Sequence, residues 1–157
     1  MTPQISFCVT AHDRPGGLQI TLGSLVAQRD VDYEILVGIN STDPSVTSDL
    51  LSVCQPYESI ATVYLNNEVN CYYQSELLAS NAFGEYLCFP SEEDYYMPTF
   101  GQRMLTKSPV DLIICNCVYD YEHDGRYKVL HGYPSVGLID KGGFLIKREL
   151  FQGFPAK

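Results

Sequence analysis

The sequence predicts an α/β domain in which helices cover both faces of a mostly parallel central sheet. Short apolar runs alternate with segments whose apolar residues recur three or four positions apart, which is the spacing of a helix face. Several of the short runs are apolar at nearly every position, as in strands that are covered on both faces. Turns rich in Gly, Pro, Asn and Asp separate these runs. Such alternation of strands and helices is typical of a parallel sheet.

The first strand and the first helix have the clearest signals. Residues 5–9 form an apolar run that predicts a strand, and residues 14–17, Arg-Pro-Gly-Gly, predict a turn. Leu18, Leu22 and Leu25 follow at helical spacing. A helix with one apolar face is therefore expected directly after the turn.

The second and third strands flank another helix. Residues 34–39 are nearly all apolar and predict a strand that is covered on both faces. Residues 40–44, Asn-Ser-Thr-Asp-Pro, combine turn and helix-capping side chains, so a helix over 45–53 is expected to follow them. Residues 61–65 predict the third strand.

The same signals predict the rest of the chain. Residues 72–83 suit a helix, because their apolar side chains form a stripe. Asp124-Gly125 lies between two runs that read as the arms of a hairpin. The further expected elements are a strand at 86–89, a helix that starts near Pro98, a strand at 112–118, a C-terminal hairpin with arms 117–121 and 126–130, a strand at 143–146 and a short helix at 148–151.

Length and charge limit the classes of function. The chain has 157 residues, and we expect residues 1–157 to form a single domain with its own core. The formal net charge of -9 argues against nucleic acid or anionic membranes as partners, because both favour basic patches. No apolar run approaches the length of a transmembrane segment, and the start shows no export signal. A soluble, cytoplasmic protein is expected.

The cysteine pattern favours free thiols. The chain has six cysteines but no CxxC pair, and only three histidines accompany them. A zinc site would need tighter spacing. Cys8, Cys88 and Cys115 lie in apolar runs, where a cysteine behaves as a small apolar residue. We therefore expect most of the thiols to be buried and unpaired.

Three acidic residues follow the predicted strand at 86–89. The apolar run stops at Pro90, and Glu92, Glu93 and Asp94 come directly after it. In an open α/β sheet, ligands bind at the edge where such strands end. Carboxylates this close repel one another unless a proton, a cation or water offsets their charge, and a divalent metal is the obvious candidate. A solvated acidic turn is the alternative interpretation of the same residues.

Four blocks of the sequence together resemble the family 2 glycosyltransferases, whose nucleotide-sugar domain has the Rossmann-like GT-A fold. Their order and spacing carry the resemblance, which covers nearly the whole chain. The blocks are residues 5–15 with 25–28, residues 33–37 with 40–43, residues 84–98 and residues 142–151.

The chain also departs from that pattern. Ser91-Glu92-Glu93 stands where the family usually has Asp-x-Asp, and Ser75-Glu76 stands where it usually has Arg-Asn. The residues that match the end of the second strand are Ile39 and Asn40, without the usual Asp. The family's base usually lies beyond a Gly-Phe that matches residues 153–154, so the resemblance implies a minimal, truncated member.

The resemblance implies roles for individual residues. Glu93 would be the first ligand of Mn²⁺ or Mg²⁺, with Asp94 beside it, and the metal would stabilise the departing diphosphate. Asp140 would be the catalytic base, with His131 as the alternative, and Tyr95, Tyr96 and Tyr133 would either stack on sugar rings or pack. The residues implied to bind the nucleotide are Thr10, Ala11, His12, Arg14, Asn40, Ser41 and Glu92.

The resulting prediction is a metal-dependent glycosyltransferase that moves a sugar from a nucleotide diphosphate sugar, a UDP-sugar, to an unknown carbohydrate or other hydroxyl acceptor. By resemblance the reaction would invert the configuration of the sugar, and homo-oligomerisation is left open. The alternative is a domain that keeps the fold and binds nucleotide and metal without catalysis, or that has a structural role. A nucleotidyltransferase is a third possibility, although residues 14–17 are a thin match to its glycine-rich loop.

Overall fold

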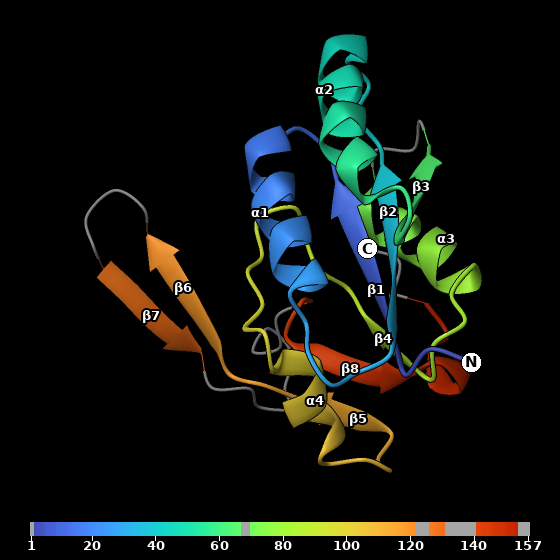
Figure 1. The fold of residues 1–157 in the computed structure, drawn as a ribbon, viewed down its shortest axis with the longest axis vertical. Coiled ribbons are helices and arrows are strands. Elements are labelled where there is room, and N and C mark those ends of the chain that lie inside the picture. Colours follow the sequence, from blue (N-terminus) through green and yellow to red (C-terminus); the bar gives the residue numbers. More distant parts are fainter. Residues whose placement is uncertain (1, 67–69, 122–125, 131–140, 154–157) are drawn as a thin grey trace.

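The structure is a computed structural model, and it describes residues 2–66, 70–121, 126–130 and 141–153. Its main element is a six-stranded sheet with the order β3-β2-β1-β4-β8-β5 (Figure 1). The central strand β1 (Ile5–Ala11) pairs in parallel with β2 (Tyr33–Ile39) and with β4 (Tyr86–Cys88), and β3 (Ala61–Leu65) extends the parallel part beyond β2. The predicted α/β fold class is confirmed.

The other edge of the sheet is antiparallel. Strand β8 (Phe144–Lys147) lies between β4 and β5 (Leu112–Ile114) and runs against both. Between β5 and β8 the chain forms the predicted hairpin, β6 (Cys117–Tyr121) with β7 (Arg126–Leu130), which stands away from the sheet in Figure 1. The single strand expected over 112–118 was wrong, because β5 ends at Ile114 and the hairpin begins at Cys117.

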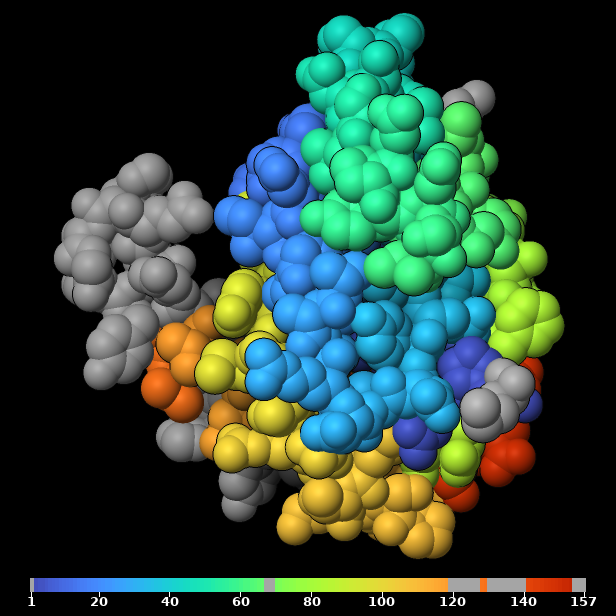
Figure 2. Space-filling view, viewed as in Figure 1, coloured from blue at the N-terminus to red at the C-terminus, as the bar shows by residue number. Residues whose placement is uncertain are grey.

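Two helices cover one face of the sheet. The inward residues of β1, among them Phe7 and Val9, are fully buried in one cluster with Leu18, Leu22 and Leu25 of α1 (Pro15–Val26). Helix α2 (Pro44–Cys54) adds Leu50 to the same cluster. The apolar stripe predicted for α1 is confirmed. Helices α1 and α2 stand in front of the sheet in Figure 1, and their atoms form the upper part of this face of the molecule in Figure 2.

Helix α3 (Cys71–Ser80) covers the opposite face. Its Leu78 packs in a second cluster with Cys8 of β1, and alternate residues of a strand point to opposite faces. α3 ends before the predicted residue 83. The Asn81 side-chain amide donates to the carbonyl of Leu77, and the N–H groups of Phe83 and Gly84 turn away to the carboxylate of Glu34.

Three short elements complete the fold. They are α4 (Phe100–Leu105) and the 3₁₀ turns η1 (Gln55–Tyr57) and η2 (Arg148–Leu150). Among the described residues, no helix has the length and apolar character needed to cross a membrane. All six cysteines are free; Cys8, Cys54 and Cys88 are buried, whereas Cys71 is exposed.

Candidate functional site

The predicted site residues gather where β1, β2 and β4 end. The chain runs from β1 outward to β3 on one side and then returns to β4 on the other side, so the order of connections reverses between β1 and β4. At this point Thr10 pairs in parallel with Ser91, and the N–H of Thr10 donates to the carbonyl of Pro90 over 3.0 Å. The loop after β1 and the acidic turn after β4 are therefore direct neighbours.

Glu92 ties these two loops together. Its Oε2 accepts the N–H groups of His12 at 2.9 Å and Arg14 at 3.1 Å, and its Oε1 accepts the N–H of Asp13 at 3.2 Å. The Glu92 residue is only 7% exposed. Successive backbone N–H groups that converge in this way form a concave anion site. In this chain Glu92 fills that site, and its predicted role as a nucleotide ligand stays a prediction.

Helix α1 fixes the segment that follows the acids. Gly17 allows the helix to approach the backbone carbonyl of Glu92 so closely that a Cβ would collide with it. The hydroxyl of Ser24 accepts the N–H of Tyr96 at 3.1 Å. The amide of Gln28 donates to the carbonyl of Met97 and accepts the N–H of Gly101. The acidic turn is thus held on a rigid support.

Glu93 and Asp94, the predicted metal ligands, have partners within the chain. The carboxylate of Glu93 pairs with the guanidinium of Arg14, and both side chains are more than half exposed. Asp94 turns back, so that its Oδ2 accepts the N–H of Ser91 at 2.7 Å. Asp94 also lies against Gly142, where a Cβ would stand 2.5 Å from the same oxygen.

Residues predicted from the second strand form the other wall. Asn40 is 2% exposed, and its N–H donates to the carbonyl of Ala11. Its Oδ1 lies 3.2 Å from Nδ1 of His12, which is a hydrogen bond when that nitrogen carries the proton. Thr10, Ala11, His12, Arg14, Asn40 and Glu92 therefore lie together at one edge of the sheet, as the sequence predicted.

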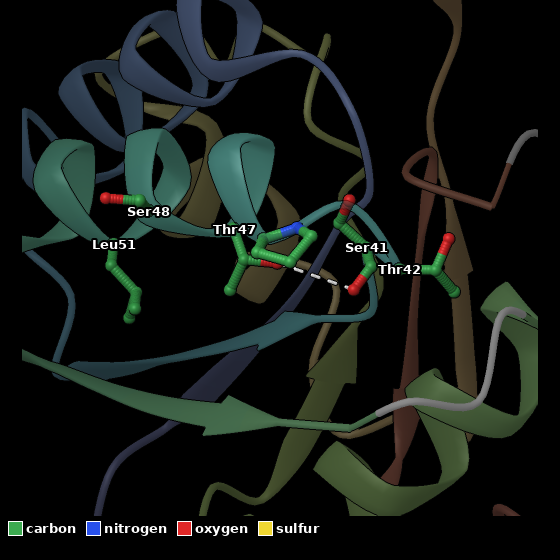
Figure 3. Close-up of a pocket in the computed structure, with 6 residues that line it drawn as sticks. Ser41, Thr42, Thr47, Ser48 and Leu51 are labelled. Carbon is green, nitrogen blue, oxygen red and sulfur yellow. Dashed lines mark hydrogen bonds between the residues drawn. The ribbon is translucent and has the colours of Figure 1, made fainter.

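Ser41 lies further out, beside the start of α2. It lines an open hollow of about 450 Å³, in which the hydroxyl of Thr47 donates to the carbonyl of Ser41 (Figure 3). The figure places Ser48 and Leu51 along the same side of the helix. The other lining residues are Thr42 and Pro44.

Sequence reasoning did not find Lys141. Its Nζ donates to the hydroxyl of Thr10 over 3.1 Å, which brings a cation to the end of β1. Lys141 directly precedes Gly142-Gly143, the start of the fourth matched block. Its place next to that block is the signal that could have found it, but only the strand order reveals that β8 lies beside β4.

The tyrosines divide between the core and the surface. Tyr96 is buried, and its hydroxyl donates to the carbonyl of Gly142 over 2.8 Å, so it packs rather than lining a sugar site. Burial is the main reason that the pKa of Tyr96 lies well above its ordinary value. Tyr95 is 65% exposed. Asp140, His131 and Tyr133 lie outside the described residues.

The acidic turn does not present a ready metal site. The oxygens of Glu92 point inward to backbone N–H groups, Glu93 has a cationic partner, and Asp94 accepts from its own turn. Within the described ranges, no group of three or more His, Cys, Asp or Glu side chains is placed to hold a metal ion. These donors do not fit the divalent cation expected from the sequence.

Comparisons with known proteins place the fold. No protein-family model matches the sequence, and no curated protein matches it. Among solved structures, TarS residues 1–349 from S. aureus gives a TM-score of 0.68 at 16% identity, over 92% of this chain and 47% of that chain. The same protein in complex with UDP gives 0.58 at 19% identity, over 69% of this chain and 34% of TarS.

A second solved protein gives a similar result. The mannosyltransferase PcManGT from Pyrobaculum calidifontis, in complex with GDP-Man and Mn²⁺, gives a TM-score of 0.60 at 13% identity, over 73% of this chain and 36% of that chain. The chain spans less than half the length of each of these proteins. It therefore shares the α/β fold of one region of TarS and of PcManGT.

Proposed function

We propose that the protein is a glycosyltransferase that moves a sugar from a nucleotide diphosphate sugar, a UDP-sugar, to a hydroxyl acceptor. The observation that carries this proposal is the gathering of Thr10, His12, Asn40 and Lys141 where the strand order reverses between β1 and β4. Ligands of open α/β sheets bind outside the carboxyl ends of the strands at such a point. Solved proteins with this fold hold UDP, UDP-GlcNAc and GDP-Man.

The edge offers different chemistry to the two ends of such a donor. At the end of β1 the half-buried imidazole of His12, held beside Asn40, is a group that can hydrogen-bond a nucleobase. Lys141 and Arg14 provide positive charge for the diphosphate, which the net charge of -9 would otherwise repel. We therefore assign the base to the β1–β2 side and the phosphates to the side of the acidic turn.

The finer assignments belong to the same proposal. We propose that the protein is a compact family 2 glycosyltransferase of GT-A type, with residues 1–157 acting as one nucleotide-sugar domain and with an inverting reaction. Asp140 remains the proposed base that deprotonates the acceptor hydroxyl. The cytoplasmic location remains a prediction from the sequence, and the acceptor is any carbohydrate or other compound with a hydroxyl group. No step of the proposed reaction is assigned to a metal, because the carboxylates have other partners.

Calorimetric titration with UDP, GDP and CMP, followed by assay of UDP-GlcNAc cleavage, tests the proposal. UDP is expected to bind more tightly than CMP, and Thr10→Val is expected to weaken UDP binding because it removes the hydroxyl beside Lys141. Thr62→Val on β3 is the matched control, since Thr62 is exposed away from this edge. Absence of binding by every nucleotide would overturn the proposal.

The same test distinguishes the transferase from the second candidate function, nucleotide binding without catalysis. A domain that binds nucleotide without catalysis would bind UDP but would neither transfer nor slowly hydrolyse the sugar of UDP-GlcNAc. The internal partners of Glu92, Glu93 and Asp94 are the observation that favours this second function. Binding together with sugar release would decide for the transferase.

A further inference from the structure

We propose that Lys141 and Arg14, rather than a divalent metal, neutralise the diphosphate of the bound nucleotide. This inference rests on the proposed function and deepens it. It predicts a donor site in which the positive charge belongs to the chain itself, so that nucleotide binding does not require Mn²⁺ or Mg²⁺.

The carboxylates of the acidic turn already have partners within the chain. Glu92 faces three backbone N–H groups and is almost fully buried, so it cannot turn outward without breaking the loop after β1. Asp94 accepts the N–H of its own turn and lies against Gly142. Glu93 is the most exposed of the three carboxylates, and it already pairs with Arg14.

Two cations lie next to that turn. Arg14 begins the segment that leads into α1, and Lys141 immediately precedes the segment that leads into β8. Arg14 contacts Glu93, whereas Lys141 contacts Thr10, whose backbone pairs with Ser91. Elements that are far apart in sequence therefore bring two positive charges to the ends of β1 and β4.

Arg14 and Lys141 can both bind phosphate oxygens, in different ways. A guanidinium binds phosphate oxygens with two parallel hydrogen bonds, and a lysine ammonium binds them as a compact charge. The pair between Arg14 and Glu93 is solvent-exposed, and such pairs are weak. Arg14 can therefore exchange Glu93 for a diphosphate at little cost. A divalent cation at Glu93 would instead have to displace Arg14 from the carboxylate.

Titration of UDP and uridine, each in Mn²⁺ and in EDTA, tests the inference on the full chain. UDP affinity is expected to agree within about twofold between the two conditions. Lys141→Ala and Arg14→Ala are each expected to weaken UDP binding about ten- to hundredfold, the loss typical of a charged hydrogen bond, and to leave uridine binding unchanged. Lys141→Arg keeps the charge and is expected to restore most of the affinity.

Matched controls separate this role from a general effect of charge. Lys107→Ala and Arg103→Ala remove exposed cations at the end of α4 and are expected to leave UDP binding unchanged. UDP binding that appears only with Mn²⁺ would overturn the inference while leaving the proposed function intact. Unchanged UDP affinity in folded Lys141→Ala would overturn it equally. Failure of UDP to bind under either condition would instead overturn the proposed function.

Discussion

The two faces of the sheet differ in where their buried polar side chains lie and in how these side chains are hydrogen-bonded. Under α1 and α2 the core is apolar, and the buried polar side chains of α1 and its end have partners: Thr21 donates to the carbonyl of Ser91, and Ser24 and Gln28 are hydrogen-bonded to the segment after the acidic turn. Under α3, polar side chains enter the sheet layer itself. Ser6 and Gln74 are both completely buried there. The face under α3 therefore carries buried polar side chains at two places, with Ser6 near the start of β1 and Gln74 beside Gly38, close to the candidate site.

Gln74 is the extreme case on the α3 face. Its amide lies against Gly38 of β2, where a Cβ would collide with it, and Gly38 pairs with Thr10 on β1. Neither the amide nitrogen nor the amide oxygen has a hydrogen-bond partner among the residues that the structure describes. A buried polar group without partners lowers stability. In contrast to the buried polar side chains of α1, Gln74 therefore lowers the stability of the layer that α3 forms on the sheet.

The largest expected effect is on the α1 face. Leu22→Ala removes a fully buried side chain and leaves a cavity, so we expect the free energy of unfolding to fall by about 2–5 kcal/mol. Urea unfolding followed by circular dichroism measures this change. A loss below about 1 kcal/mol would mean that this face is not the stable layer of the fold.

Glu34 tests the paired polar network of the α3 face. Its Oε1 accepts the hydroxyl of Ser6 at 2.6 Å and the N–H of Gly84 at 3.0 Å. We expect Glu34→Ala to lower the free energy of unfolding by about 2 kcal/mol, because the hydroxyl of Ser6 and the N–H of Phe83 lose this acceptor, whereas the N–H of Gly84 keeps the hydroxyl of Ser6. Glu34→Gln keeps one acceptor oxygen and is expected to cost less. Equal losses for the two variants in urea unfolding would contradict this explanation.

Gln74→Met is expected to change stability in the opposite direction. Methionine has a similar length and lacks the unpaired amide, so we expect the free energy of unfolding to rise by about 1–2 kcal/mol. Thermal unfolding measures this gain. A loss of stability would show that the amide is better accommodated than its contacts indicate. Combined with UDP titration, the same variant reports whether the unpaired amide serves the ligand.

The smallest effect is expected on the outer side of α1. Ile20 is 58% exposed, so Ile20→Ser is expected to change the free energy of unfolding by no more than about 0.5 kcal/mol. It is the control for Leu22→Ala on the same helix. A loss similar to that of Leu22→Ala in urea unfolding would mean that the outer side of α1 is covered in solution.

The sequence predicted most elements because their signals are local. The arms of the hairpin and the third strand match their observed bounds, since turn residues such as Asp124-Gly125 act on their immediate neighbours. The position of β8 between β4 and β5 could not be predicted, because strand order depends on packing between distant segments.

The candidate site, too, could be predicted only in part from the sequence. The gathering of the residues around Thr10 and Asn40 followed from strand ends that share one edge of the sheet. The different partners of Glu92 and Glu93 could not be predicted, since two adjacent glutamates are chemically identical in a sequence. Only the position of the backbone N–H groups of residues 12–14 determines which carboxylate turns inward.

The direct pairing of β5 with β8 has a consequence for how this fold can diversify. Ile114 and Phe144 are register partners, and the N–H of Cys115 donates to the carbonyl of Gly143, so the chain leaves and re-enters the sheet at one place. Doubling the length of such a closed segment costs only about 0.6 kcal/mol in loop entropy. The hairpin of β6 and β7 is therefore an exchangeable module. A segment of another length can replace it while the strand order β3-β2-β1-β4-β8-β5 is preserved.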